Sequence, residues 1–419
     1  MHGCKPTPFS TLTLAYVNEK SNRLAVGDQI EVEIGNVAHG GHFIARHEGQ
    51  VIFVRHGITG ERALIEITQV TSKIARADVM KVLEASPARV EAPCKYAKPE
   101  LCGGCDFQHI DLAFQRELKR RVVVEQFKRI GGLDIEIDIK DVPPADGLHW
   151  RTRMDFAVSP QGKMGLFSSR SNEVIELDDC LIASAKMNLP ELTTRIWKGS
   201  DRVEVAVSST GERSVMRGGR SISGATELHE KVLDNSYSCS PVTFWQSHKS
   251  APSTLVKTAL DWLGAKPGDI TCDLYGGAGL FTAQLSKQVG ENGKVHLVEL
   301  DRNAIHDARG IFKVTKNVEI HQGRVEVELK KISQNSNTKN AKLDLILLDP
   351  PRTGAGSEVI ASMVKAGPRK IVYVSCDPAS LARDAKELVA AGYEIGQIVG
   401  YDLFPMTSHV ECITEFNKR

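Results

Sequence analysis

The segment 273-DLYGGAGLF-281 decides how the C-terminal part of this chain is expected to fold. It follows an apolar run and precedes a helical pattern, so it has the form of a strand, a tight turn and the start of a helix. Gly276, Gly277 and Gly279 let the backbone turn sharply and approach a ligand closely. Alone, such a loop is a weak signal, because dinucleotide-binding domains share it.

A carboxylate on the next expected strand narrows the choice of cofactor. Glu299 lies at the end of that strand, 26 residues after Asp273. It can accept hydrogen bonds from both ribose hydroxyls of a nucleoside cofactor, whereas the simpler interpretation is a surface Glu beside Asp301. The loop favours S-adenosylmethionine over NAD, because S-adenosylmethionine has no pyrophosphate for the helix N-terminus to hold.

The pattern around the loop predicts a doubly wound α/β sheet. Helical stretches lie between most of the strand-like runs, which fall at 270–275, 294–300, 317–321, 343–348, 370–375, 394–400 and 410–416. The last two runs have no helix between them, which is typical of a Rossmann-like, seven-stranded class I methyltransferase sheet with an antiparallel final strand. We assign residues 241–419 to this domain, and we expect the polar segment 332–341 to be a flexible loop.

Three reactive side chains are expected to meet at one edge of this sheet. Ligands bind beyond the carboxyl ends of parallel strands, where Asp349 and Cys376 lie, and an antiparallel final strand begins at the same edge with Glu411. Asp377 and Pro378 suit a helix N-cap and first helical residue, so the thiol of Cys376 would lie at a helix N-terminus. That position favours thiolate, the charge of Asp377 opposes it, and we expect a poised cysteine rather than an inert buried one.

A nucleophilic thiol beside S-adenosylmethionine has a specific use. The C5 carbon of a pyrimidine is a poor nucleophile, but attack of a thiolate on C6 makes C5 enolate-like and able to take a methyl group. A base must then remove the C5 proton so that the thiol can leave. The chemistry requires one cysteine, one carboxylate base and one group that orients the ring.

Three motifs carry a family resemblance: 349-DPPRTG-354, 375-SCDPASLARD-384 and 404-FPMTSHVE-411. In this order they resemble the RNA uracil-5-methyltransferase family, in particular its TRAM-containing, iron–sulfur branch that acts on 23S ribosomal RNA. The resemblance implies that Cys376 is the nucleophile, Glu411 the general base, Asp349 the group that orients uracil, and Arg352 a supporting residue.

The same resemblance implies a set of cofactor contacts. Gln246, in 244-FWQ-246, matches the family's Phe-x-Gln position. The implied contacts with S-adenosylmethionine come from Gln246, Tyr275, Gly276, Glu299 and Asp349, with Gly323 or Glu326 as weaker candidates on the third strand.

The N-terminal part reads as a small barrel. Five short strand-like runs fall at 29–34, 42–47, 50–55, 62–70 and 75–84, which is typical of an OB-like β-barrel. The run 38-AHGGHFIARHEGQVIFV-54 resembles the TRAM domain of the same family, which implies RNA binding. We assign residues 12–88 to this barrel. We assign residues 89–240 to a mixed α+β central domain, whose segment 112–130 reads as a basic helix that is either solvated or tracks phosphates.

Three cysteines of the central domain are closely spaced, as P-C-x7-C-G-G-C. They are Cys94, Cys102 and Cys105, and Cys180 is a fourth candidate. No second C-x-x-C or histidine pair suggests zinc, and a third cysteine does not suit a thioredoxin-like dithiol. A set of three plus one thiolates suits an iron–sulfur cluster, and the resemblance implies a 4Fe–4S cluster with a structural or RNA-positioning role.

Composition limits which classes of protein the sequence is compatible with. The chain has 419 residues, a net charge of +1 and nine cysteines, with no apolar run long enough to span a membrane. An odd cysteine count and a start without signal-peptide features predict a cytoplasmic protein rather than a disulfide framework. We expect a monomer that binds RNA, with ribosomal RNA favoured and the T-loop uridine of tRNA as the alternative.

Three other functions remain open from the sequence. An adenine amino-methylating enzyme would also use a D-P-P motif, but it needs no cysteine. Cytosine-5-methyltransferases place their thiol after a proline, which Cys376 does not follow. The last alternative is an iron–sulfur RNA-binding or RNA-folding factor that does not transfer methyl groups.

Overall fold

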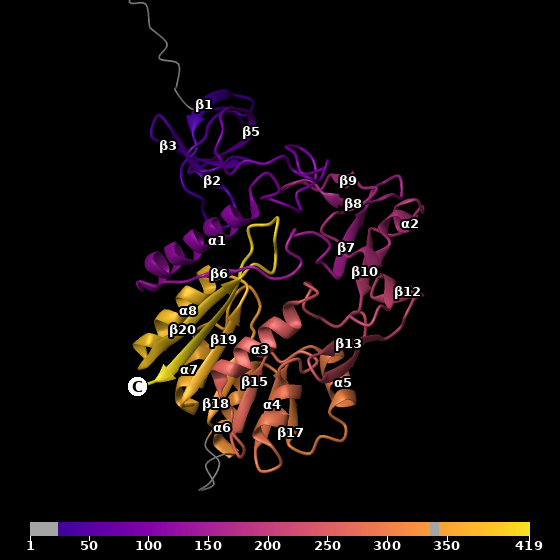
Figure 1. The fold of residues 1–419 in the computed structure, drawn as a ribbon, viewed down its shortest axis with the longest axis vertical. Helices are drawn as coiled ribbons and strands as arrows, with labels where there is room; N and C mark the ends of the chain where they lie inside the picture. Colours follow the sequence, from indigo (N-terminus) through magenta and orange to yellow (C-terminus); the bar gives the residue numbers. More distant parts are fainter. Residues whose placement is uncertain (1–23, 336–342) are drawn as a thin grey trace, which may run out of the picture.

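The computed structural model describes residues 24–335 and 343–419. A small barrel, an antiparallel sheet and a larger α/β sheet follow one another along the chain (Figure 1). The predicted start of the barrel at residue 12 lies outside the described residues, as does segment 336–341 of the predicted loop. Residues 332–335 of that loop belong instead to the end of a helix, so this part of the prediction is wrong.

The N-terminal barrel has the predicted strands to within a residue or two. They are β1 (Gln29–Glu33), β2 (Phe43–His47), β3 (Gln50–Arg55), β4 (Arg62–Val70) and β5 (Ala75–Glu84), in the order β1-β4-β5-β3-β2. The residues after β1 close the barrel, because Gly35 N donates to Ile44 O (2.7 Å) and Ile44 N donates to Asn36 O (3.0 Å). This closure removes the free edges and leaves an apolar interior.

The central part is built on a six-stranded antiparallel sheet in the order β12-β11-β10-β7-β8-β9. Its strands are β7 (Arg153–Val158), β8 (Met164–Phe167), β9 (Val174–Glu176), β10 (Arg202–Val207), β11 (Arg213–Arg217) and β12 (Arg220–Gly224). A 3₁₀ turn (Ala185–Met187) and helix α2 (Leu189–Thr193) pack on it, and a hairpin of β13 (Leu228–Val232) and β14 (Asn235–Cys239) leads to the α/β sheet.

Helix α1 (Leu112–Gln126) joins the barrel to the α/β sheet (Figure 1). Leu118 and Val122 pack into the barrel core, whereas Val123 and the following π-helical turn (Phe127–Gly131) pack against the sheet. The sequence predicted one helix over 112–130 with a solvated or phosphate-tracking basic face. The structure instead buries part of that face between two layers.

The α/β sheet has eight strands, one more than the seven predicted. Its order is β17-β16-β15-β18-β19-β21-β20-β6, and the extra strand β6 (Ile139–Lys140) comes from the segment after α1. β21 is antiparallel to both β19 and β20, as predicted. The other strands are β15 (Ile270–Leu274), β16 (Lys294–Glu299), β17 (Val318–Gln322), β18 (Leu345–Leu348), β19 (Lys370–Ser375), β20 (Tyr393–Tyr401) and β21 (Glu411–Lys418).

Helices cover both faces of this sheet because its strands are apolar on both sides. One face carries α3 (Ala251–Leu263), α4 (Thr282–Val289) and α5 (Arg302–Ile311). The other carries α6 (Val325–Asn335), α7 (Ser357–Ala366) and α8 (Pro378–Ala390). No helix in the described part of the chain is long and apolar enough to cross a membrane.

Candidate active site

The strand ladder places Cys376 and Glu411 opposite each other. β19 and β21 pair with Ser375 facing Cys412, and one further step in that register brings Cys376 against Glu411. Cys376 is partly exposed, whereas Glu411 is only 3% exposed. Residues 35 apart in the sequence therefore meet because the last strand returns to the carboxyl edge.

Asp349 lies on the neighbouring strand at the same edge. β15 and β18 pair with Leu274 facing Leu348, so the next residues, Tyr275 and Asp349, lie side by side. The Nε2 of Gln246 donates a hydrogen bond to Oδ2 of Asp349 at 2.9 Å. The structure thus brings together the predicted catalytic residues and two of the predicted cofactor residues.

Burial and neighbouring carboxyl groups raise the pKa values of the three reactive groups. Burial, with a smaller contribution from Asp273, raises the pKa of Asp349 to about 7. Burial and the charge of Asp349 hold the pKa of Glu411 well above its usual range. Burial, followed by the charges of Glu411 and Asp349, raises the pKa of Cys376 to about 12.

We expected a poised cysteine, with the helix N-terminus favouring thiolate and Asp377 opposing it; the structure adds burial and the charges of Glu411 and Asp349 to the opposing side. The helix start is as predicted, since Asp377 caps α8 and Pro378 is its first residue. The surrounding carboxyl groups and the burial nevertheless outweigh the favourable helix N-terminus. Only Arg352, which comes within 3.4 Å of His409, lowers the pKa of both Cys376 and Glu411.

Helix α1 holds the loop that precedes Glu411. The buried amine of Lys119 donates to Asp402 Oδ1 (2.5 Å) and to Phe404 O (3.0 Å). The buried amide of Gln115 accepts from Met406 N at 2.9 Å. Sequence reasoning missed both residues, because a basic helix gives no sign that one of its lysines is buried against a partner 283 residues away.

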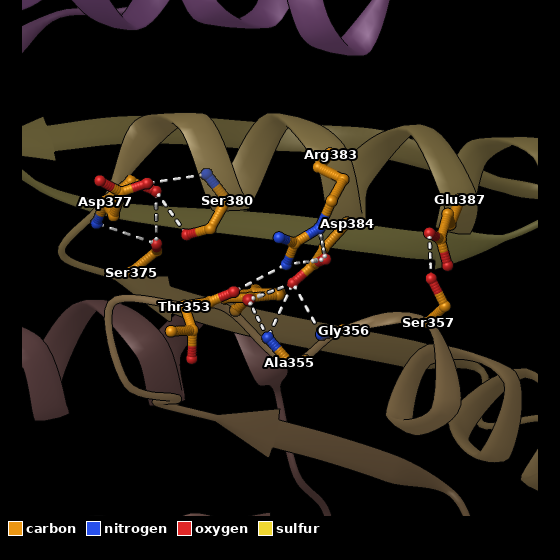
Figure 2. Close-up of polar contacts among 11 residues, drawn as sticks. Thr353, Ala355, Gly356, Ser357, Ser375, Asp377, Ser380, Arg383, Asp384 and Glu387 are labelled. Atoms are coloured by element: carbon orange, nitrogen blue, oxygen red, sulfur yellow. Dashed lines mark hydrogen bonds and ion pairs between the residues drawn. The ribbon is translucent and has the colours of Figure 1, made fainter. Parts of the chain in front are cut away.

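Helix α8 holds the loop 349–354, which begins with Asp349, as Figure 2 shows. Asp384 Oδ2 accepts hydrogen bonds from Ala355 N (2.8 Å) and from the hydroxyl of Tyr373 (2.7 Å). Arg383 donates to the carbonyl oxygen of Thr353 at 2.8 Å. These contacts fix the 349–354 loop against the helix that begins beside Cys376, and the only sequence signal for them was their place in the 375–384 motif.

The barrel also reaches this site. Nε2 of His39, in the loop between β1 and β2, lies 2.9 Å from Oδ2 of Asp377. The other oxygen of Asp377 accepts from Ser380 N at 2.8 Å and so caps α8. An N-terminal residue is thereby bonded to the neighbour of Cys376.

The glycine-rich loop fits a nucleoside cofactor. Gly277 N donates to Glu299 Oε2 at 3.0 Å, and the other oxygen of Glu299 accepts the amides of Leu300 and Asp301. A Cβ at Gly279 would come within 2.3 Å of Phe312, so only glycine is accommodated there. Gly323 N donates to the carbonyl oxygen of Glu299, and Glu326 lies near enough to raise the pKa of Tyr275.

Below this loop, Asp273 is buried with one oxygen unpartnered. Its Oδ2 accepts from the hydroxyl of Thr282 at 2.6 Å, whereas Oδ1 has no hydrogen-bond partner in the described structure. Burial raises the pKa of Asp273 to about 7. The carboxyl group is therefore poised to gain a partner beside the loop.

The four predicted metal-ligating cysteines come together in the central part. Cys94, Cys102, Cys105 and Cys180 line one cavity whose wall includes Leu166 and Leu177. Burial raises the pKa of Cys180 to about 11, with smaller contributions from the other thiols, and Gly104 N lies 3.4 Å from the sulfur of Cys102. The donor set is therefore four thiols in a largely apolar setting.

Comparisons with known proteins identify the family of this chain. The family model "tRNA (Uracil-5-)-methyltransferase" matches residues 222–419, and the TRAM domain model matches residues 23–80. An uncharacterized RNA methyltransferase of Streptomyces avermitilis is 40% identical, over 93% of this chain and 98% of that protein. One of Corynebacterium glutamicum is 35% identical, over 94% of this chain and 98% of that protein.

A solved structure supports the fold over nearly the whole chain. It is the Pyrococcus abyssi tRNA (uracil-54, C5)-methyltransferase in complex with S-adenosyl-L-homocysteine. Its TM-score is 0.67 at 22% identity, and the match covers 92% of this chain and 99% of that one. The family models and the relatives show that the chain belongs to the S-adenosylmethionine-dependent RNA uracil-5-methyltransferases and carries a TRAM domain.

Proposed function

We propose that this protein methylates C5 of one uridine in 23S ribosomal RNA through a covalent bond between Cys376 and C6 of the base. The observation that carries the proposal is that Cys376 directly follows β19 and Glu411 begins the antiparallel strand β21, at the edge where Asp349 also lies. One nucleophile, one base and one orienting group are what this reaction requires.

The steps follow from the protonation states. The thiol of Cys376 must lose its proton as the substrate binds. This proton goes to Asp349 or to solvent, so that Glu411 stays ionised for the later step. The sulfur then adds to C6, and the electron pair makes C5 nucleophilic. S-adenosylmethionine supplies an electrophilic methyl group when bound. Glu411 takes the C5 proton, the C6–S bond breaks and the thiolate is released.

The cofactor residues retain the roles expected from the sequence. Gln246, Tyr275, Gly276, Glu299 and Asp349 would hold S-adenosylmethionine, with Glu299 on the ribose. The hydrogen bond between Gln246 and Asp349 links the cofactor contact to the group that orients uracil. Arg352 would moderate the negative charge of the site.

The four cysteines would hold a 4Fe–4S cluster. Four thiols that line one largely apolar cavity fit an iron–sulfur cluster, whose part here is to fix the central fold or to position RNA.

A groove between the barrel and the central part supports an RNA path. It has a volume of about 850 Å³ and is lined by Arg55, Arg76 and Arg170. Arg76 stacks over Phe53 at 5.7 Å from the ring centroid, which provides a platform for a base. Burial, followed by the charges of these arginines, lowers the pKa of His42 to about 4. Asp78, Glu100 and Glu173 also line the groove, so the three arginines are the groups there that would contact phosphates.

Two RNAs are candidates for the substrate. The combination of a TRAM domain with the four-cysteine set supports ribosomal RNA as the substrate. The T-loop uridine of tRNA is the second candidate, favoured by the family model that matches residues 222–419. Mapping 5-methyluridine in both RNAs from cells with and without the gene tests the choice. Loss of one ribosomal site supports the proposal, and loss of the tRNA site overturns it.

A further inference from the structure

Three ligating side chains lie on the edge of the α/β sheet, away from the reactive loops. His296 of β16 pairs with Glu319 of β17, and His321 follows two residues later on β17. Paired residues of parallel strands face the same side, as do residues two apart on one strand. All three side chains therefore project from the face that carries α6.

Their ligand atoms converge at the spacing of a single metal ion. Nδ1 of His296 lies 3.0 Å from Nε2 of His321 and 3.6 Å from Oε2 of Glu319. All three ligand atoms lie within 4.8 Å of one another. A tetrahedral zinc ion with bonds of 2.0–2.1 Å places its ligands about 3.3 Å apart, which is close to the two measured spacings.

One cation lies beside the three side chains. The exposed amine of Lys294 lies 3.2 Å from Glu319 and is the cation that a metal would have to displace.

The site is open to the outside. It borders a cavity of about 740 Å³ that is also lined by Glu328 and Lys331 of α6. A metal held by three protein groups would keep its remaining position toward this space, as exchangeable zinc sites do.

We propose that His296, Glu319 and His321 form a binding site for a divalent transition-metal ion of the zinc class. The ion would clamp the edge strand β17 to β16. Since the site lies away from the carboxyl edge of the sheet, its effect would be on stability rather than on methyl transfer. Without a metal, the trio is a hydrogen bond between two histidines and an ion pair with Lys294.

The test is zinc titration of the full-length protein, purified anaerobically with its cysteine site intact. Isothermal calorimetry and metal analysis would compare wild type with His321→Ala and Glu319→Gln. The control is His229→Ala, because His229 is also a histidine bonded to a glutamate, Glu212, but it lies on the β13–β14 hairpin. Melting curves with and without zinc would give an independent reading.

The proposal predicts that wild type and His229→Ala each bind one more zinc ion per chain than His321→Ala does. Zinc should raise the melting temperature of wild type and His229→Ala, because ligand binding to the folded state stabilises it. Loss of one ligand should weaken binding at least about tenfold. Equal zinc stoichiometry and affinity in wild type, His321→Ala and Glu319→Gln would overturn the proposal. So would a melting temperature that responds equally to zinc in all of them.

Discussion

Replacing Glu411 with Gln should separate the two halves of the proposed reaction. The change keeps the size of a side chain that is only 3% exposed, but it removes the group assigned to take the C5 proton. The charge of Glu411 contributes to the raised pKa of Cys376, so a neutral amide lowers that pKa and leaves the attack on C6 unimpaired. Elimination should become the slow step.

The expected loss of turnover is large because the site of Glu411 is buried, so water has little access to act as the base in its place. General bases contribute about 10²–10⁴-fold, and the burial of Glu411 places this case toward the upper end. A loss of about 10³–10⁴ in turnover corresponds to about 4–5.5 kcal/mol in the barrier. Asp349 remains nearby, but it is engaged by Gln246. The covalent enzyme–RNA species should therefore accumulate.

The assay is a single-turnover reaction with unmodified RNA, resolved on a denaturing gel. Glu411→Gln should give a band of protein joined to RNA, while Cys376→Ser gives none. The matched control is Glu415→Gln, which changes another buried glutamate four positions along β21, paired with Lys370. It should turn over normally. Near-normal turnover by Glu411→Gln, or lost turnover without any adduct, would refute the assignment.

Three further predictions concern stability, the cysteines and RNA. Folding raises the pKa of Asp273 to about 7. The folded chain therefore keeps a proton that the unfolded chain releases from about pH 4. The free energy of unfolding should fall as the pH rises from about 4 to about 7. Asp273→Asn, which keeps an acceptor for Thr282, should gain about 4 kcal/mol relative to wild type between pH 4 and pH 8 in urea unfolding. Cys105→Ser should lose the bound iron and its visible absorbance. Arg170→Ala should weaken RNA binding and reduce the salt slope of log Kd by about 0.7.

A control, a contrary result or both accompany each of these predictions. An equal stability difference between Asp273→Asn and wild type at pH 5 and pH 8 would contradict the burial argument. Cys239→Ser changes a cysteine outside the cavity and should keep its iron, and the cluster proposal fails if Cys105→Ser keeps it too. Arg195→Ala, whose arginine pairs with Glu191, should leave the salt slope unchanged.

The parts of the fold that sequence reasoning found are those whose signal is local. Parallel strands buried on both faces read as apolar runs, and the glycine loop and motif loops follow such runs directly. The seven strands from β15 to β21 were therefore predictable. β6 was not, because two residues carry no periodic pattern and pair only through the tertiary fold.

The parts that were missed depend on distant partners. Lys119 reads as one more surface cation until Asp402 is placed beside it. Similarly, the pKa of Cys376 cannot be judged from its helix position alone, since the carboxyl groups that raise it come from two other strands. Sequence motifs identified which residues meet, whereas their protonation states required the packed site.

The most direct measurement is a trapping experiment with RNA that carries 5-fluorouridine. Fluorine at C5 cannot leave as a proton, so elimination is blocked once the sulfur has added and the methyl group has transferred. Incubation with S-adenosylmethionine, followed by protease digestion and mass spectrometry, should give a methylated 5-fluorouridine nucleotide bound to the peptide that contains Cys376. An adduct on another residue, or none from an RNA that the enzyme methylates in its unfluorinated form, would contradict the account.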